Sequence, residues 1–225
     1  MSIDFDHSGT TLTALPSGAL WWAERRLLCV ADLHLGKSER LARRGGALLP
    51  PYEVQETLTR LQADIEGLGP ATVICLGDSF DDDAAATGLP EGALAWIARL
   101  QAGRRWVWIA GNHDPAPLTL AGTHLGELQE GPLRFRHIAA PGACGEVSGH
   151  YHPKARLAGK ARACFLFDAS RVILPAYGAY TGGLWCDGPE LASLMGAEAR
   201  AILRGPRLHM IPMPRLRQVR ARRAG

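Results

Sequence analysis

The 225-residue sequence has no apolar run that approaches the ~20 residues needed to cross a bilayer. Its first eleven residues are polar and acidic, and they lack the basic and then apolar segments of a secretory signal. It has neither an internal repeat nor a long low-complexity linker. We therefore expect a cytoplasmic protein with no membrane partner.

The sequence also lacks the cysteine patterns of a disulfide framework or of a sulfur-ligated metal site. It has five cysteines, with no CxxC pair and no regular spacing. Cys29 and Cys75 lie inside apolar runs, where a free cysteine behaves as a small hydrophobic residue. Nothing around the five thiols supports a catalytic cysteine, and an odd number of thiols fits a reducing compartment.

Acidic residues are missing from the last part of the chain. From Arg200 onwards there are eight arginines and no acid, which leaves 17 basic and 22 acidic residues in the rest. We expect a single domain over residues 1–214 and a basic tail over residues 215–225. A basic tail on an acidic body suggests contact with a polyanion such as DNA.

What the sequence does contain is an alternation of strands and helices, followed by strands. In the first half, apolar periodicity predicts strands at 19–22, 27–31, 71–76 and 106–110 and helices at 52–66 and around 94–100. In the second half it predicts strands at 133–138, 146–148, 163–167, 172–175 and 208–211. This pattern favours an α/β protein built as a layered sandwich with mixed sheets.

Polar clusters follow three of the predicted strands, at residues 31–34, 77–78 and 111–114. Ligands of open α/β sheets gather beyond the carboxyl ends of the strands, so these clusters can converge. Asp32 and His34 are two residues apart, and in extended backbone this spacing points both side chains to one face. A fourth cluster, residues 148–153, repeats the spacing with His150 and His152. Each cluster alone has an ordinary explanation as a turn, a cap or a core histidine, but the ordered set indicates a metal site.

The order Asp-x-His, Gly-Asp, Gly-Asn-His-Asp and Gly-His-x-His resembles the calcineurin-like metallophosphoesterase superfamily over residues ~25 to ~155. Residues 31–37, the basic segment to Arg44, two glycines, Leu49-Pro50 and residues 149–153 are also similar to the ligase-associated DNA damage response endonuclease (PdeM) family. The resemblance implies an αββα sandwich with two mixed sheets flanked by helices. It also implies a DNA-repair endonuclease that cleaves single-stranded or damaged DNA beside a DNA ligase and a repair helicase.

The same resemblance implies roles for individual residues. The first metal would be held by Asp32, His34 and His152. The second would be held by Asn112, His137 and His150. The two ions would be bridged by Asp78. The catalytic acid or transition-state stabiliser would be His113, which would not be a ligand and would be oriented by Asp114. A hydroxide between two ions ~3.5–4 Å apart would attack phosphorus in line. Oxygen and nitrogen ligands without sulfur favour two Mn²⁺ ions, with Fe or Zn as alternatives.

The sequence departs from the family pattern at His137, because Ile138 follows it where the family often has a glycine. His124 is the alternative, although it lies in a turn-like stretch. We expect His137 to be the ligand.

Substrate contacts are expected from basic and aromatic residues near the motifs. Lys37, Arg40 and Arg44 would share one helix face if a helix begins at Ser38, and this face could either bind phosphates or simply be solvated. Tyr151 is the residue expected to stack on a base. The acidic run 81–83 is expected to be a solvated loop with a helix cap rather than a third metal site.

Two alternatives to a DNA endonuclease remain. One is a phosphodiesterase or phosphatase for small phosphoesters such as cyclic nucleotides. The other is a metal-holding repair accessory that binds DNA without turnover, although such a protein would not need the His113–Asp114 pair.

Overall fold

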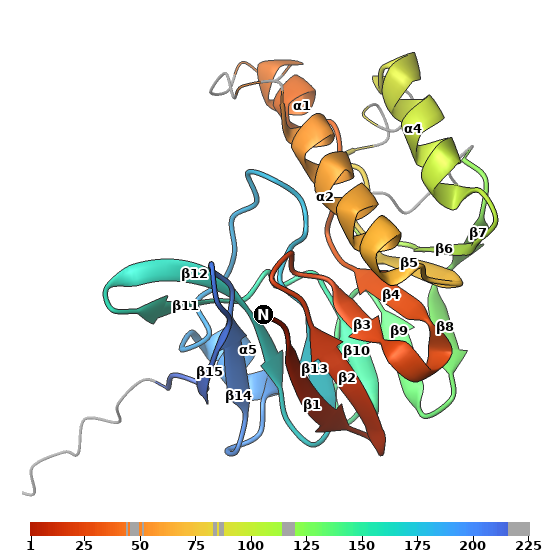
Figure 1. Cartoon of the computed structure of the whole chain (residues 1–225). Coiled ribbons are helices and arrows are strands. Elements are labelled where there is room, and N and C mark those ends of the chain that lie inside the picture. Colours follow the sequence, from red (N-terminus) through yellow and green to blue (C-terminus); the bar gives the residue numbers. More distant parts are fainter. Residues whose placement is uncertain are drawn as a thin grey trace, which may run out of the picture.

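The computed structural model of the protein describes residues 1–43, 45, 50, 52–82, 85, 88–113 and 120–215. Two β-sheets pack face to face, and helices cover the outer face of each (Figure 1). The predicted layered α/β sandwich with two mixed sheets is therefore confirmed. None of the helices in these ranges is long and apolar enough to cross a membrane.

The first sheet runs in chain order. Its strands are β1 (Ile3–His7), β2 (Thr10–Ala14), β3 (Leu20–Trp22), β4 (Leu27–Val30), β5 (Thr72–Leu76), β6 (Arg105–Ile109) and β7 (Thr123–Leu125). Neighbours from β1 to β4 are antiparallel, and the 3-10 turn η1 (Ala23–Arg25) closes the predicted β3–β4 hairpin. Neighbours from β4 to β7 are parallel, so the ends of β4, β5 and β6 lie at one edge.

The second sheet has the order β15-β14-β12-β13-β10-β9-β8, and β11 pairs with β12. Its strands are β8 (Glu127–Glu130), β9 (Leu133–Arg136), β10 (Glu146–Ser148), β11 (Lys154–Leu157), β12 (Lys160–Phe167), β13 (Arg171–Ile173), β14 (Arg200–Leu203) and β15 (His209–Pro212). Strands β9, β10 and β13 are parallel neighbours, and the other pairs are antiparallel.

Helices α2 (Glu53–Leu68) and α4 (Glu91–Gln101) pack on the first sheet. Leu58, Leu61 and Ile65 recur on one side of α2 and are fully buried against the sheet. The short helix α1 (Lys37–Arg43) follows the first polar cluster, and α5 (Pro189–Leu194) packs on the second sheet. The helical layer on the second sheet is therefore thinner than the helical layer on the first sheet.

Strand β5 shows why the central strands read as uninterrupted apolar runs. Ile74 and Leu76 face the second sheet, whereas Val73 and Cys75 face the helices. Successive side chains of a strand point to opposite faces, and both faces are covered here. A polar residue that follows such a strand is held at a fixed position on the sheet edge.

The sequence did not predict strands β1, β2, β7, β8, β11 and β14. Strand β14 was missed because it lies within the arginine-rich end of the chain. Ala201, Ile202 and Leu203 are buried, and Arg204 follows them. The basic run is therefore interrupted by sheet structure, and residues 216–225 of the expected tail lie outside the described residues.

Candidate metal centre

The four polar clusters meet at the edge where the parallel strands of the first sheet end. Asp32 and His34 follow β4, Asp78 follows β5, and Asn112 and His113 follow β6. The second sheet supplies the remaining side chains from the segments after β9 and β10, which are His137, His150 and His152. The carboxylate and imidazole groups form two separate triads.

The first triad consists of Asp32, His34 and His152, whose ligand atoms lie within 4.8 Å of one another. Nε2 of His152 is 3.1 Å from Oδ1 of Asp32. The backbone N–H of His150 donates to both oxygens of Asp32, at 3.1 and 3.0 Å. These hydrogen bonds fix the carboxylate, which follows a strand of the first sheet, against the segment that follows β10 of the second sheet.

The second triad consists of Asp78, His137 and His150, again within 4.8 Å. Nε2 of His137 lies 3.3 Å from Oδ2 of Asp78 and 3.2 Å from Nδ1 of His150. The side-chain oxygen of Asn112 is 3.0 Å from the same Nε2 atom. Nδ1 of His137 lies 2.9 Å from the Leu76 carbonyl, so its proton is donated there and Nε2 is left to face the other ligands.

Asp78 belongs to the second triad and also faces a histidine of the first. Its Oδ2 atom is 3.3 Å from Nε2 of His137 and 4.0 Å from Nε2 of His34. Its Oδ1 atom accepts a hydrogen bond of 2.8 Å from the backbone N–H of His113. Burial alone would raise the pKa of Asp78, but the contacts with His137, His113 and His34 outweigh it and lower the pKa to about 2. The carboxylate is therefore negatively charged at neutral pH.

Most residues of the two triads have a left-handed backbone conformation. Positive φ angles occur at Asp32 (55°), His34 (45°), Asp78 (45°), His150 (70°) and His152 (45°). The extended backbone assumed from the two-residue spacing is therefore wrong, and left-handed residues aim the paired side chains instead. Such conformations cost of order 1–3 kcal/mol each and gather at functional sites.

Two glycines make room for the ligands. A Cβ atom at Gly77 would lie 2.4 Å from Nδ1 of His137, and one at Gly149 would lie 2.6 Å from Oδ2 of Asp32. Gly77 also has a φ of +71°, which larger residues rarely adopt. The glycines of the Gly-Asp and Gly-His-x-His motifs are therefore required by contact with the facing ligand.

The residues fit divalent metal ions. The Nε2 atom of His34 is buried and has no hydrogen-bond partner within the described ranges, although it faces the carboxylate of Asp78. An imidazole nitrogen left unpaired in a buried acidic site is a ligand donor. The two triads are consistent with a binuclear site, and their nitrogen and oxygen donors suit Mn²⁺, Fe or Zn²⁺.

Asp81 is part of this site, which the sequence did not predict. Its side chain has no exposed surface, and its Oδ1 atom lies 2.8 Å from Nδ1 of His34. The expectation of a solvated loop is therefore wrong for this residue, because the segment after β5 folds back against His34. A sequence signal was lacking, since Asp81 and Asp82 are indistinguishable by pattern.

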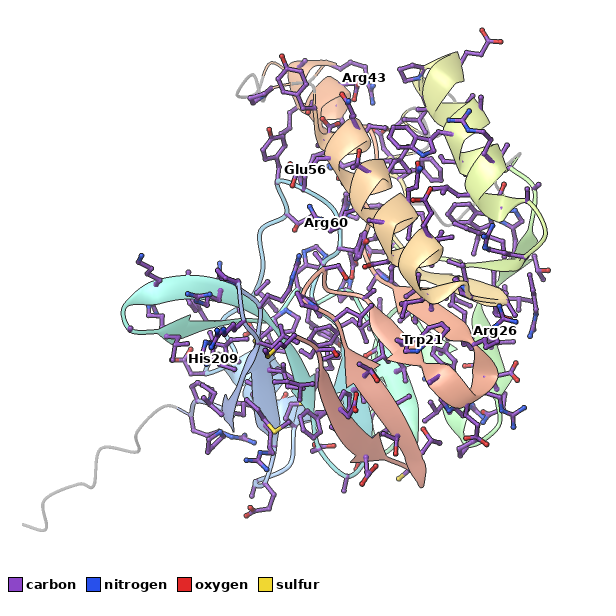
Figure 2. The ribbon with its side chains drawn as sticks, in the orientation of Figure 1. Trp21, Arg26, Arg43, Glu56, Arg60 and His209 are labelled. Atoms are coloured by element: carbon purple, nitrogen blue, oxygen red, sulfur yellow. The ribbon has the colours of Figure 1, made fainter. Side chains whose placement is uncertain are left out.

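The expected phosphate-binding face of α1 is largely paired with acids. Arg40 Nη1 is 2.7 Å from Oδ2 of Asp81, and Lys37 Nζ is 3.8 Å from its Oδ1. Arg43 pairs with Asp82 at 2.9 Å, and Figure 2 shows Arg43 at the end of α1. Arg44 lies outside the described residues. The charge that these cations could offer to a phosphate is thus partly neutralised.

His113 approaches the first triad without joining it. Its ring stands edge-on to His34, with the centroids 5.3 Å apart. Its Nδ1 atom lies 2.9 Å from the backbone carbonyl of Asp81, which orients the ring. Asp114, expected to play that part, lies outside the described residues.

His124 and Tyr151 occupy different surroundings. His124 stacks on Trp108 and its Nε2 atom is 3.1 Å from the Leu120 carbonyl, so it belongs to neither triad. The ring of Tyr151 is edge-on to His150, with the centroids 5.0 Å apart. Tyr151 is partly exposed and packs against the core under α5, next to the second triad.

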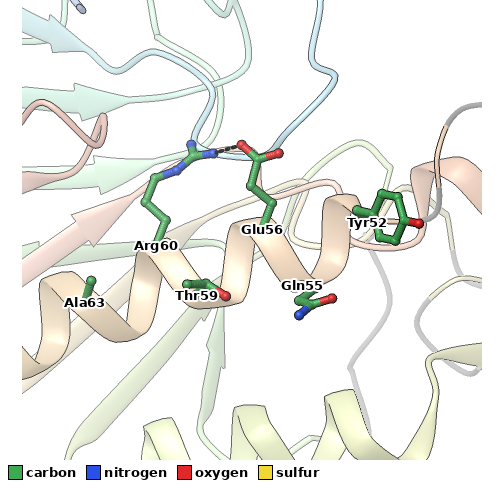
Figure 3. A pocket seen from close by; sticks show the side chains of 6 residues that line it. All are labelled: Tyr52, Gln55, Glu56, Thr59, Arg60 and Ala63. Atoms are coloured by element: carbon green, nitrogen blue, oxygen red, sulfur yellow. Dashed lines mark hydrogen bonds and ion pairs between the residues drawn. The ribbon is translucent and has the colours of Figure 1, made fainter. Parts of the chain in front are cut away.

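Hollows flank the centre and also occur away from it. One of about 320 Å³ is lined by Asn112, His137 and Arg136. Another, of about 460 Å³, runs along α2 and contains the Arg60–Glu56 ion pair (Figure 3). It is lined by a single helix and the residue before it, and none of its residues belongs to a triad.

A two-sheet α/β sandwich with two His/Asp triads at the strand ends defines a metal-dependent hydrolase. The family model for calcineurin-like phosphoesterases matches residues 25–195, and the chain belongs to this family of phosphoesterases. The crystal structure of the Pseudomonas putida nuclease MPE is similar, with 28% sequence identity and a TM-score of 0.74. The similarity covers 94% of this chain and 100% of that one. No curated protein matches the chain.

Proposed function

We propose that this phosphoesterase is a DNA endonuclease that uses two Mn²⁺ ions and acts in DNA repair. The observation that carries the two-ion part is the position of Asp78, whose carboxylate faces a histidine of each triad. Asp32, His34 and His152 would hold the first ion. Asn112, His137 and His150 would hold the second, with Asp78 shared between them.

Bound ions would supply Lewis acidity and a water of lowered pKa for attack on phosphorus. The chain itself orients the donors. The Leu76 carbonyl fixes the proton of His137, and Asp81 holds the ring of His34. His113 stands beside the first triad with Nδ1–H donating to a carbonyl, so in the imidazolium form Nε2–H is the group that would give its proton to the departing oxygen.

The nucleic-acid part of the proposal is supported by the likeness to a nuclease along almost the whole chain. The preference for single-stranded or damaged DNA, and work beside a DNA ligase and a repair helicase, follow from the sequence resemblance alone.

A substrate panel with Mn²⁺ tests the proposal. Circular single-stranded DNA should become linear, since an endonuclease needs no strand end, and Asp78→Asn protein should leave it intact. An aryl phosphodiester and a cyclic nucleotide should be tested in parallel. Hydrolysis of the small diesters with intact DNA would point to a small-phosphoester enzyme, and no turnover with any substrate would favour a metal-holding accessory.

A further inference from the structure

The β11–β12 hairpin is the most basic continuous segment within the described residues. It projects beyond the edge of the second sheet (Figure 1). Residues 154–162 contain four cations and no acid, which are Lys154, Arg156, Lys160 and Arg162. None of the ion pairs formed among the described residues involves these side chains, in contrast to Lys37, Arg40 and Arg43 on α1.

Two of these cations are held side by side by one aromatic ring. The guanidinium carbon of Arg156 lies 3.7 Å from the ring centroid of Trp185, and Nζ of Lys154 lies 4.7 Å from it. Trp185 is fixed beside β11 because the residues on either side of it bond to Lys154. The Lys154 N–H donates to the Leu184 carbonyl, and the Lys154 carbonyl accepts from the Cys186 N–H, each at 2.9 Å. An aromatic face orients a cation without neutralising it, so the charge stays available to an anion.

The hairpin is continuous with the metal centre. Lys154 comes two residues after His152, and a pocket of about 180 Å³ is lined by both of them together with Arg162 and Arg204. No acidic residue from the described part of the chain lines this pocket. Its volume is below the roughly 300–1,000 Å³ of pockets for whole small ligands, so it suits a single group such as a phosphate.

Arg204 adds a fixed positive charge to this pocket. It donates to the backbone carbonyls of Pro16 and Ala176, each at 3.2 Å. Burial and the nearby Arg60 lower its pKa to about 10, so the guanidinium remains charged at neutral pH. Arg162 donates to the Arg204 carbonyl at 3.1 Å and is held against the same wall.

We propose that the pocket beside His152 binds a phosphate next to the one being cleaved, and that Lys154 and Arg156 guide the same nucleic-acid strand along the β11–β12 hairpin. This inference rests on the proposed function, since it names the surface by which that metal centre would receive a polymer. A row of unpaired cations that starts at a metal ligand and runs outward matches the spaced negative charges of a nucleic-acid backbone.

The test uses the full-length protein loaded with Mn²⁺ and the variant Lys154→Gln/Arg156→Gln. The kcat/KM of the variant on a single-stranded oligonucleotide should be lower than that of the wild type by at least roughly tenfold, which is the scale of losing charge-assisted contacts. The loss on an aryl phosphodiester should be several times smaller. For a single strand the slope of log rate against log salt should flatten by about 1.4, at ~0.7 for each phosphate contact removed.

Arg25→Gln/Arg99→Gln is the charge-matched control, because it removes two positive charges from exposed residues that belong neither to the hairpin nor to the pocket beside His152. It should keep the oligonucleotide rate and the salt slope of the wild type. Should the hairpin variant keep them as well, the inference is wrong while the nuclease proposal stands. Equal losses on both substrates in the single variant Arg156→Gln, whose residue is further along the chain from His152, would also overturn it. If wild-type protein hydrolyses the aryl diester but no DNA, the proposed function itself fails.

Discussion

Nδ1 of His34 lies 2.8 Å from Oδ1 of Asp81, and that carboxylate has no exposed surface. Oδ2 of Asp81 pairs with Arg40 at 2.7 Å, and the backbone carbonyl of Asp81 lies 2.9 Å from Nδ1 of His113. Burial raises the pKa of Asp81, but the contacts with His34, Arg40 and Lys37 hold it well below its usual range. One residue thus orients both a metal ligand and the proposed acid.

Asp81→Ala should weaken metal binding at the first triad, because His34 would lose the partner that fixes its ring. Loss of such a partner typically lowers metal affinity 10–100-fold. Calorimetric titration with Mn²⁺ measures the change in metal affinity. Asp82→Ala is the control, since the described contacts of Asp82 are with Arg43, Arg40 and the Ala85 N–H rather than with a metal ligand. Equal effects of both substitutions would contradict the role given to Asp81.

Asp78→Asn should lower metal occupancy at both sites and abolish turnover, because Asp78 faces both triads. Metal content per chain, measured on protein dialysed after loading, gives the stoichiometry. Asp4→Asn, on the exposed side of β1, should keep two equivalents. Two full equivalents and normal activity in Asp78→Asn would rule out a shared ligand.

His113→Ala should retain both metals but lose on the order of 10²–10⁴ in rate, the range for a positioned acid. The substitution removes a ring that belongs to neither triad. Rates on an aryl phosphodiester and metal content should be measured together, with the exposed His209→Ala on β15 as control (Figure 2). Collapse of the metal content would make His113 a ligand instead.

His137→Ala should weaken the second metal and the activity, since Nε2 of His137 faces Asp78, Asn112 and His150. His124→Ala should leave both nearly unchanged, because its ring is stacked on Trp108. The comparison needs only metal content and kcat/KM for the two proteins. The opposite outcome would assign the ligand to His124.

Tyr177→Phe should destabilise the fold without touching the metals. The fully buried Tyr177 donates to Asp64 at 2.9 Å and thereby ties the loop after β13 to α2. Removing this hydrogen bond to a partly buried carboxylate should lower the free energy of unfolding by about 1–3 kcal/mol. Thermal unfolding should show it as a lower Tm, whereas Tyr52→Phe, at a tyrosine that is 63% exposed, should leave Tm unchanged.

Composition and periodicity alone predict the central strands, the two long helices and the order of the polar motifs. Strands such as β5 are covered on both faces, so their composition alone marks them. Strands β1 and β2 alternate between buried and exposed residues over five positions, which is too short a pattern to separate from a loop. Local composition therefore reports the buried middle of the sheets better than their edges.

The charged groups that face one another are set by the packing of the sheets and helices and cannot be predicted from the sequence. Lys37 and Arg40 are basic by sequence, yet Asp81 lies against them after the chain passes through α2 and β5. Among the described residues the hairpin cations Lys154 and Arg156 have no acidic partner, and they share Trp185, which follows about thirty residues later. Pairing between charges depends on distances in space of a few ångströms, and sequence order does not fix those distances until the sheets have packed.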